Sequence, residues 1–492
     1  MDISSTLLVG ITTAFSFDNL IYCFVGVLLG TFVGVLPGIG ALAAISLLLP
    51  LSYHLDPTGA IIMLAGVFYG ANFGGSIASI LMNLPGTPAH AVTCIDGYKM
   101  TLQGRGGPAL IITAASSFVG GMIGVMILIL FSPAVAQAAF AFGPAEFFSM
   151  MLLGLTAASM MSSSGVLRNL AMLLLGILLG LVGMDINSGI PRFTFGIAEL
   201  TDGINLVALA MGLFGVAEMI DRLSHETKIT VSSIKGRVWP SIQEWRDSVF
   251  PTLRGTAVGA FFGALPGTGP ATASFISYAL EKKIDHQESV GNGSIEGIAG
   301  PEAANNAAAQ TEFVPTLSLG IPGDAITALL LAVLVIHGIQ PGPLLMTQQP
   351  ELFWGLIVSF VIGNFMLLIL NIPLIKIWVG LLKTPYCVLY PTVLVMTAIG
   401  VYSVNNNVFD ILLVILFGIM GFIMKRMQFD PAPLLLGFVL GPMVEENFRR
   451  ALTITQGNFS IFLDRPISMI FLSLTVCILS WPLLKRLYQR IL

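Results

Sequence analysis

The sequence predicts an all-α polytopic membrane protein with about 10–14 transmembrane or re-entrant helices in two repeats of inverted topology. Hydrophobic residues make up 55% of the chain and charged residues only 10%. Many apolar runs approach the roughly 20 residues that a helix needs to cross a bilayer. A Pro-Gly motif interrupts such runs in both halves of the chain. Together, these three observations predict the helix content, the membrane location and the internal symmetry.

The composition excludes a soluble globular protein. The 492 residues have a mean hydropathy of +0.90, and their charged fraction lies far below the roughly 25% of soluble domains. The net charge is −4, from 22 Lys and Arg against 26 Asp and Glu, and the cations form no clustered basic face. We therefore expect no nucleic-acid partner and a lipid bilayer as the environment of the chain.

Apolar segments divide the chain into spans and shorter arms. Spans are expected at about 19–36, 58–82, 108–131, 146–162, 167–185, 204–221, 255–266, 325–338, 352–371, 386–403, 407–424 and 467–484. The segments 41–51, 270–280 and 432–443 are too short to cross alone, so we expect half-helices or re-entrant arms there. A polar, basic stretch predicts a linker between the halves. The expected organisation is a first repeat at 1–221, a cytoplasmic linker at 222–254 and a second repeat at 255–492.

The distribution of Lys and Arg orients the chain, because these residues concentrate in cytoplasmic loops. Outside the linker, the cations that we place in the cytoplasm are Lys99, Arg105, Arg168, Lys376, Lys383, Lys425, Arg426, Lys485, Arg486 and Arg490. Loops 132–145 and 339–351 contain neither Lys nor Arg and are placed outside. Arg449, Arg450 and Arg465 do not fit this pattern, so the topology of 432–465 stays open.

The two halves share two motifs in the same order. Residues 30–44, GTFVGVLPGIGALAA, and residues 259–273, GAFFGALPGTGPATA, are identical at eight of fifteen positions. A second Pro-Gly follows in each half, in SILMNLPGTPAHA at 79–91 and in TLSLGIPGDAITA at 316–328. The loop after the first of these carries cations, whereas the corresponding loop of the second half carries none. The halves are therefore predicted to face opposite ways, as in many secondary transporters.

The first pair of Pro-Gly loops, at 37–40 and 266–269, interrupts helices inside apolar stretches. Proline ends a helical arm, and glycine permits close approach of the backbone to a ligand. A helix that begins after each loop points free amide N–H groups and its positive dipole end at the loop, which makes an anion site without buried Arg or Lys. A tight turn or a close helix crossing is the alternative for either loop, and the duplication favours binding.

The second Pro-Gly pair places Thr87 and Asp324 at matched positions. Hydroxyl, amide and unwound carbonyl oxygens suit a hard cation, so a Na+ near Thr87 and Asp324 is one prediction. Asp324 also opens the apolar run 325–336, where it would cap a helix. Capping and cation coupling both remain open for this residue.

Two polar stretches lie just upstream of the second motifs, YGANFGGSIAS at 69–79 and GPEAANNAAAQTEFVPTLS at 300–318. In a helix, Glu302, Asn305 and Asn306 share a face, and the neighbouring alanines let another backbone approach. Two carboxylates and three amides near apolar spans exceed what helix packing requires. We therefore predict a functional role for this stretch.

The remaining polar residues are interpreted as structural. The cysteines and histidines have no ligand spacing, so we expect no metal and no cofactor. Asp96, close to Lys99, is interpreted as a surface contact. Glu445 and Glu446, each with an Arg at i+4, predict a charge network on a helix. No phosphate-binding G-x-x-x-x-G-K-[ST] sequence occurs, which favours an ion gradient over ATP hydrolysis.

These motifs resemble those of the large subunit of tripartite tricarboxylate transporters, the TctA family. The similarity is carried by residues 34–98, 263–283, 291–325 and 430–452. The resemblance implies a bacterial inner-membrane protein with a small membrane partner of the TctB type and a periplasmic binding protein of the TctC type. It also implies uptake of tricarboxylates such as citrate, or of related carboxylates, driven by a cation gradient. An elevator-like motion is a further analogy with other inverted-repeat carboxylate carriers.

We therefore predict the large membrane subunit of a binding-protein-dependent secondary transporter, without enzymatic activity, and consider a homodimer among its assemblies. A passive channel or permease for small organic anions is the alternative, and an intramembrane enzyme ranks below both because no catalytic motif occurs. Na+ or H+ would be coupled through Glu302, Glu312 and Asp324. The candidate substrate-binding residues are Pro37, Gly38, Gly40, Asn72, Ser76, Asn83, Gly86, Thr87, Pro266, Gly267, Thr268, Gly269, Asn305, Asn306, Gln310, Thr316 and Gly323.

Overall fold

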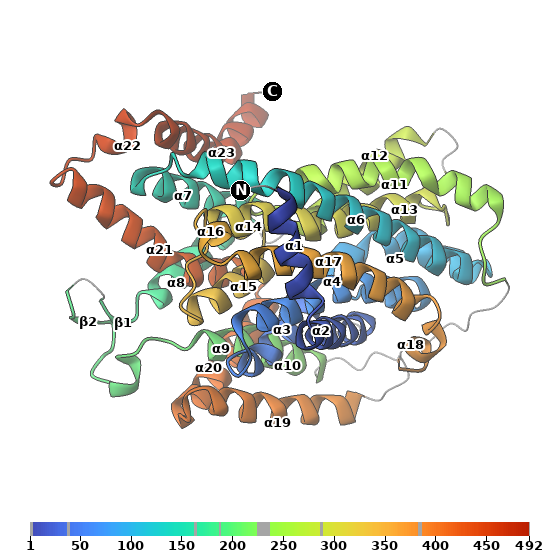
Figure 1. The fold of residues 1–492 in the computed structure, drawn as a ribbon, viewed down its shortest axis with the longest axis horizontal. Coiled ribbons are helices and arrows are strands. Elements are labelled where there is room, and N and C mark those ends of the chain that lie inside the picture. Colours follow the sequence, from blue (N-terminus) through green and yellow to red (C-terminus); the bar gives the residue numbers. More distant parts are fainter. Residues whose placement is uncertain are drawn as a thin grey trace.

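The computed structural model describes residues 3–36, 40–161, 165–185, 188–223, 237–285, 289–381 and 386–491. Across these residues the fold is all-α apart from one antiparallel sheet, β1 (Gly183–Met184) and β2 (Pro191–Arg192). Five described helices are long and apolar enough to cross a membrane, and shorter apolar helices accompany them. The chain is an all-α polytopic membrane protein, as predicted (Figure 1).

In the first half, every predicted span is a helix. The α4 helix, for example, begins where the Asp56 side chain accepts the amide N–H of Gly59 and Pro57 occupies the first turn. The single span expected at 204–221 is built from α9, a π-helical segment η3, and α10, which follow one another without a break. The helices of this half are α1 (Ile3–Ala14), α2 (Phe17–Val35), α3 (Gly40–Ser52), α4 (Pro57–Met82), η1 (Pro88–Ala91), α5 (Thr93–Leu102), α6 (Gly106–Ala139), α7 (Pro144–Met161), α8 (Val166–Gly180), η2 (Ala198–Leu200), α9 (Leu206–Ala210), η3 (Met211–Val216) and α10 (Ala217–Leu223).

A helix begins before the predicted start of the second half. The α11 helix starts inside the expected linker, because Ser241 and Glu244 form a capping box there. Residues 224–236 of that linker lie outside the described residues. The helices of this half are α11 (Ile242–Gly263), α12 (Gly269–Ile284), α13 (Glu296–Thr311), α14 (Phe313–Leu319), α15 (Ala325–Ile336), α16 (Leu345–Gln348), α17 (Pro350–Asn371), α18 (Ile375–Leu381), α19 (Tyr386–Asn405), α20 (Val408–Arg426), α21 (Ala432–Ile454), α22 (Ile461–Asp464) and α23 (Pro466–Ile491).

The segment 432–443 is not a half-helix, so this prediction was wrong. It forms the first part of α21, which continues as one helix of 23 residues. The continuation is stabilised by charge pairs at i+4, with Glu445 at 2.6 Å from Arg449 and Glu446 at 2.5 Å from Arg450. The predicted charge network is therefore confirmed. The length was underestimated because the apolar run ends where the paired charges begin.

Two helix pairs with the same packing lie at the centre of the two halves. On α2, a Cβ added at Gly26, Gly30 or Gly34 would overlap a carbonyl oxygen of α4. On α11, a Cβ added at Gly255 or Gly259 would overlap a carbonyl oxygen of α13 in the same way. Glycine at every fourth position lets two helix backbones touch. This shared packing supports a duplicated unit, and the opposite orientation of the copies stays a prediction.

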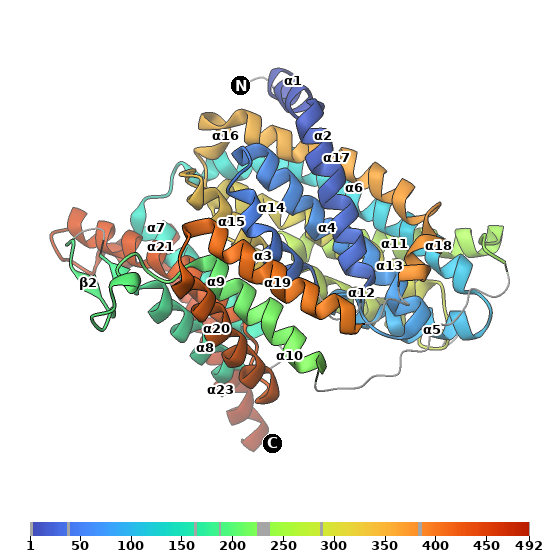
Figure 2. The same cartoon turned by 90° about the horizontal axis from the view of Figure 1, so that it is seen from below.

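The two halves share one core. The α13 helix of the second half packs against α4, α5 and α6 of the first half as well as against α11 and α12. Residues 297–311 of α13 are all buried, and α4 is buried along its apolar length. Figures 1 and 2 show α4, α6, α13 and α17 together in the interior of the molecule, with α19 and α23 at its periphery. Elements from both halves can therefore contribute to one site.

Candidate functional site

A cavity of about 610 Å³ lies where segments from both halves meet. Its wall includes the first residues of α3, α12, α15 and α21, the turn at 85–89, and parts of η3 and α20. Of the predicted site residues, those that line it are Gly40, Asn72, Gly86, Thr87 and Asp324.

The two copies of the first Pro-Gly loop end at equivalent glycines. Gly40 has a φ of 73° and Gly269 a φ of 60°, a left-handed conformation that glycine adopts without steric cost. Each glycine begins a helix, α3 in the first half and α12 in the second. Gly40 and Pro270 both line the cavity. Pro37 and Gly38 lie outside the described residues, and the depth of the loops in the bilayer stays a prediction.

Four helices begin at the cavity wall. The α3, α12, α15 and α21 helices have 13, 16, 12 and 23 residues. Free amide N–H groups and the positive ends of helix dipoles stabilise anions at such positions. Among the described residues of the lining, Lys425 is the one Lys or Arg, and its ammonium lies 2.6 Å from a Glu218 oxygen and 2.7 Å from an Asp221 oxygen. The lining also contains the carboxyl groups of Glu218, Asp324 and Asp430, so attraction for an anion has to come from the backbone.

Close contacts surround the Pro-Gly motifs of the two halves. The Ser274 hydroxyl of α12 donates to the Ala89 carbonyl at 2.8 Å, which links the second half to the turn of the first. A Cβ added at Gly269 would lie 3.3 Å from the Asp324 Cβ. In the first half, a Cβ added at Gly86 would overlap a carbonyl oxygen of α2. The small residues of these motifs are thus required for packing as well as for lining the cavity.

Asp324 caps α15. Its Oδ1 accepts the amide N–H groups of Ile326 at 2.8 Å and Thr327 at 2.9 Å, and the Thr327 hydroxyl accepts the Asp324 amide N–H at 2.9 Å. The structure therefore realises the capping alternative. A coupling role for Asp324, and a Na+ near Thr87 and Asp324, stay predictions.

A buried histidine connects the cavity to α13. His90 Nδ1 lies 2.7 Å from the Thr87 hydroxyl oxygen, and Nε2 lies 2.7 Å from the Asn72 carbonyl oxygen. Nε2 also lies 3.7 Å from a Glu302 carboxylate oxygen, and both of these side chains are fully buried. The ring fits here because Gly75 has no side chain, since an added Cβ would lie 2.6 Å from Nδ1. The sequence analysis assigned His90 no role.

Hydrogen-bond donors surround Glu302. The Thr93 hydroxyl donates to Oε1 at 2.5 Å, while the Ser117 hydroxyl and the Asn305 amide lie 3.4 and 3.3 Å from Oε2. Asn306 donates to the Glu302 carbonyl at 3.0 Å and to the Asn305 side-chain oxygen at 2.6 Å. The polar face of α13 is thus a buried network, and these residues do not line the cavity.

Glu312 is a buried carboxylate whose two oxygens have no hydrogen-bond partner in the described part of the chain. It lies against Gly323 of the second Pro-Gly motif in the second half. A Cβ added at Gly323 would be 2.6 Å from the Glu312 Cβ. Asn72 Nδ2 and Gln310 Oε1 are likewise buried without a described partner. Burying an unpaired ionised carboxylate costs several kcal/mol. The Glu312 side chain therefore requires a proton or a bound cation.

The other predicted residues do not line the cavity. Asn83 is the exposed, left-handed C-cap of α4, and the Ser76 hydroxyl donates to a carbonyl of its own helix. The Thr268 hydroxyl donates to carbonyls at the end of α11, and the Thr316 hydroxyl donates to the Glu312 carbonyl at 2.6 Å. Residues 266–267 form the turn that precedes α12. Binding roles for these residues stay predictions.

Comparison with known proteins identifies the family of this chain. The chain matches the Tripartite tricarboxylate transporter TctA family over residues 20–436. The chain therefore belongs to the TctA family. This TctA chain is 47% identical over 493 residues to the "Uncharacterized 52.8 kDa protein in TAR-I ttuC' 3'region" of Agrobacterium vitis, with 100% of this chain and 98% of that protein aligned. It is 49% identical over 223 residues to the "Uncharacterized protein in TAR-II ttuC' 3'region" of the same organism, across 45% of this chain and 92% of that protein. No solved structure matches it.

TctA membership confirms the predicted family and gives the chain a transport role. The matched residues 20–436 include both pairs of Pro-Gly motifs and every described residue that lines the cavity. Within the described residues, no group of three or more His, Cys, Asp and Glu side chains is placed to hold a metal ion.

The TctA cavity also has walls that the sequence analysis did not single out. Leu213 and Phe214 of the π-helical segment η3 line it, together with Gly421 and Lys425 of α20. A π-helical turn widens a helix and often marks a functional site. A weak sequence signal was present in the closely spaced glycines of this segment, of which Gly212 packs against the α20 backbone.

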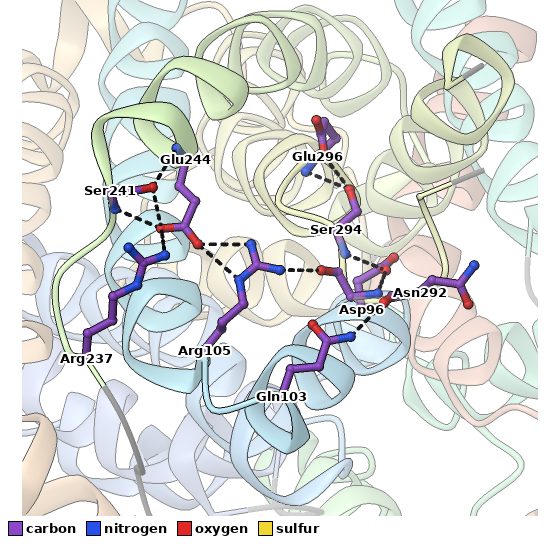
Figure 3. A network of polar contacts seen from close by, with 10 residues as sticks. Asp96, Gln103, Arg105, Arg237, Ser241, Glu244, Asn292, Ser294 and Glu296 are labelled. Carbon is purple, nitrogen blue, oxygen red and sulfur yellow. Dashed lines mark hydrogen bonds and ion pairs between the residues drawn. The ribbon is translucent and has the colours of Figure 1, made fainter. Parts of the chain in front are cut away.

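The surface role predicted for Asp96 was wrong, because this carboxylate is fully buried. Its Oδ1 accepts the amide N–H groups of Gly291, Gly293 and Ser294 at 2.9, 2.7 and 3.0 Å (Figure 3). Its Oδ2 accepts the Gly291 amide at 2.9 Å and the Tyr278 hydroxyl at 3.1 Å. Both glycines have positive φ values, which turn successive amides toward one point. We call Asp96 and the loop 289–294 the Asp96 clamp.

Side chains of α5 and of the residues just after its C-terminal end also hold the loop 289–294. Lys99, Gln103 and Arg105 donate to its carbonyl groups, the last two at 3.0 Å. Arg105 also pairs with Glu244 of α11 at 3.0 Å (Figure 3). Burial raises the pKa of Glu244, but hydrogen bonds from Ser241 and Arg105 outweigh it and leave this pKa below the ordinary value. The clamp thus ties α5 of the first half to the start of α11 and α13.

Proposed function

We propose that this TctA chain is the large membrane subunit of a binding-protein-dependent secondary transporter that takes up tricarboxylates or related organic acids. Its membrane would be the bacterial inner membrane, and its partners a small subunit of the TctB type and a periplasmic protein of the TctC type. Family membership supports the transport role. The geometry of the cavity supports a negatively charged substrate.

The convergence of four helix N-termini on one cavity carries this proposal. A volume of about 610 Å³ lies within the range of roughly 300–1,000 Å³ that small-molecule sites occupy. The starts of α3 and α12, one from each half, offer amide N–H groups to a carboxylate, whereas Asp324 and Asp430 already accept amides at the starts of α15 and α21. Because these two starts approach from different halves, they suit a solute with two or three carboxylates. The Asn72 amide on the wall, which has no partner among the described residues, adds a donor from a side chain.

We propose Glu312 as the group that binds the coupling cation. This carboxylate has no described partner, and a proton or Na+ would supply one. Glu302 is less suited, because three donors already surround it. The Glu312→Gln variant is expected to bind carboxylate but to lose accumulation driven by the ion gradient. Asp324→Asn is the parallel test, and unchanged ion dependence would remove Asp324 from the coupling site.

The decisive experiment is transport in liposomes that contain the chain with its small subunit, in the presence of the binding protein. Radiolabelled citrate and a panel of other di- and tricarboxylates are tested under an imposed Na+ gradient, an imposed proton gradient, or neither. Accumulation above equilibrium under one gradient is the expected result. Equilibration without accumulation would indicate a channel. Failure of every carboxylate to enter would refute the transport function.

A matched pair of substitutions tests the position of the site. Ala271 lines the cavity beside the start of α12, whereas Ala257 is exposed on α11. Ala271→Leu is expected to reduce uptake at least tenfold, because the added methyl groups occupy the cavity and crowd its wall. Ala257→Leu adds the same volume outside the cavity and serves as the control. Equal uptake by both variants would place substrate elsewhere.

A further inference from the structure

We infer that His90 is a proton-dependent positioning residue, which acts on the bound carboxylate through the Thr87 hydroxyl of the cavity wall. The inference rests on the proposed function, which supplies an anion at this cavity. When His90 takes up a proton, the Thr87 hydroxyl turns from the imidazole toward the substrate. Binding of the anion is therefore linked to binding of a proton at a group that substrate does not touch.

The contacts of the two ring nitrogens determine the neutral form of His90. Nε2 lies 2.7 Å from the carbonyl oxygen of Asn72, and a carbonyl oxygen can only accept. Nε2 therefore carries the hydrogen, and Nδ1 is the acceptor. The Thr87 hydroxyl, 2.7 Å from Nδ1, must donate to it. In this state the hydrogen of the hydroxyl points into the ring and is not offered to the cavity.

Protonation of His90 reverses this hydrogen bond. Nδ1 then carries a hydrogen and donates to the Thr87 oxygen, so the hydroxyl hydrogen is free to rotate. Thr87 lines the cavity, where a carboxylate oxygen would accept this hydrogen. The positive charge of the imidazolium is balanced by Glu302, whose Oε2 lies 3.7 Å from Nε2. A fully buried histidine can carry its charge here because this carboxylate lies beside it.

The surroundings of His90 contain one acidic group close to the ring. The turn that carries His90 packs against α4, α5, α12 and α13. Among the described residues, Glu302 is the acidic group within 4.0 Å of the imidazole. Asp96 and Tyr278 bind each other, and Glu281 pairs with Arg254. The remaining titratable groups of these four elements are Tyr69, Cys94, Tyr98, Lys99, Lys282, Lys283 and Glu296.

The matched turn of the second half has a threonine at the position of the histidine. Asp324 and Thr327 occupy the positions of Thr87 and His90, and they also form a hydrogen-bonded pair at i,i+3. Thr327 cannot change charge, so the cap that it forms with Asp324 is fixed. Histidine, by contrast, changes charge between about pH 5 and 8. Of the two matched turns, the first therefore carries a group at this position, His90, that can take up a proton.

The test measures citrate uptake by the reconstituted complex between about pH 5.5 and 8, the range in which histidine changes charge. His90→Gln keeps a donor and an acceptor but cannot take up a proton. Because citrate also titrates, the quantity compared is the KM of the variant divided by the KM of the wild type at each pH. This ratio is expected to be near one at the alkaline end and on the order of ten- to a hundredfold higher at the acidic end, the weight of one hydrogen bond to a charged group.

Three further variants and a control separate the switch from a structural effect. Thr87→Val lacks the hydroxyl and is expected to show the same pH-dependent ratio, whereas Thr87→Ser keeps a hydroxyl and the wild-type pH dependence. Glu302→Gln removes the counter-charge and is expected to move the transition to lower pH. His337→Gln is the matched control, because this half-buried histidine contacts the Ser52 carbonyl and does not line the cavity.

The outcomes distinguish this inference from the proposed function. A ratio that is independent of pH in both His90→Gln and Thr87→Val would overturn the switch while leaving transport intact. Absence of carboxylate uptake by the wild type would refute the proposed function instead. If His90→Gln does not fold, Thr87→Val alone carries the test, because valine has nearly the shape of threonine.

Discussion

Replacement of Asp96 by asparagine is the sharpest test of how the two halves are joined. The carboxylate is fully buried and accepts three amides of the loop 289–294 together with the Tyr278 hydroxyl. Asparagine keeps the shape of the side chain but has one acceptor oxygen and no charge. Its NH₂ group must replace one of the two carboxylate oxygens. It then faces either the amide N–H groups of Gly291, Gly293 and Ser294 or the Tyr278 hydroxyl and the Gly291 amide. Asp96→Asn therefore weakens the Asp96 clamp without creating a cavity.

The magnitude follows from the hydrogen bonds that change. A hydrogen bond to a charged group contributes about 1.5–3 kcal/mol and a neutral one about 0.5–1.5 kcal/mol. Three amide bonds become neutral, and the amide of Gly291 loses its second acceptor. We expect a net loss of about 3 kcal/mol in the free energy that holds the loop closed. Since each 1.36 kcal/mol is a factor of ten, opening of the loop would increase roughly hundredfold.

Hydrogen exchange of the peptide that contains residues 289–295 measures this opening, because the amides of Gly291, Gly293 and Ser294 in it donate to Asp96 and exchange when they are released. Exchange in Asp96→Asn is expected to be on the order of a hundredfold faster than in the wild type. Asp464→Asn is the control, because Asp464 is exposed and binds Ser460 at another end of the molecule. Wild-type exchange rates in Asp96→Asn would refute the reasoning.

Three other perturbations test separate parts of the structure. Glu244 has a lowered pKa, so the stability that its carboxylate contributes is present above the ordinary value of 4.5 and is lost as the pH falls through the folded-state pKa. The fluorescence emission of the adjacent Trp245 should follow this loss. The Glu244→Gln variant should show no such pH-dependent change in emission. Gly259→Ala is expected to destabilise the chain by about 1–3 kcal/mol in thermal unfolding, whereas Gly380→Ala, which meets open space, should be neutral; equal effects would contradict the close packing of α11 on α13. Lys425→Gln is expected to raise the KM for carboxylate several-fold by leaving two acidic neighbours at the cavity, with Lys425→Arg near wild type; an unchanged KM would exclude this ammonium from substrate binding.

Helix positions were largely predictable, because the apolar run and the residues that end it are both local. The span expected at 58–82 is α4, which begins after Asp56 and ends at left-handed Asn83. The length of α21 was not predictable from hydropathy, because its second half is held by charge pairs. The π-helical turn of η3 depends on packing against α20, a contact between residues far apart in sequence.

The candidate site was predictable where the repeat carried the signal. Gly40, Thr87 and Asp324 line the cavity, and all three belong to the duplicated motifs. Asp96 was misread, because the adjacent Lys99 offered a local explanation while its real partners come from a loop nearly two hundred residues later. His90 lacked any spacing typical of a ligand. Alignment of its turn with the second copy would have matched it to a capping residue and drawn attention to it.

The Asp96 clamp and the His90 switch share elements, so a perturbation of one is expected to reach the other. Asp96 holds the loop 289–294, which leads directly into α13, and α13 carries Glu302. If Asp96→Asn lets the start of α13 move, the distance from Glu302 to His90 increases and the imidazolium loses part of its counter-charge. The pH dependence of citrate KM should then shift to lower pH, in the direction expected for Glu302→Gln. Faster hydrogen exchange with an unshifted pH dependence would show that the clamp holds the halves together without setting the charge of the site.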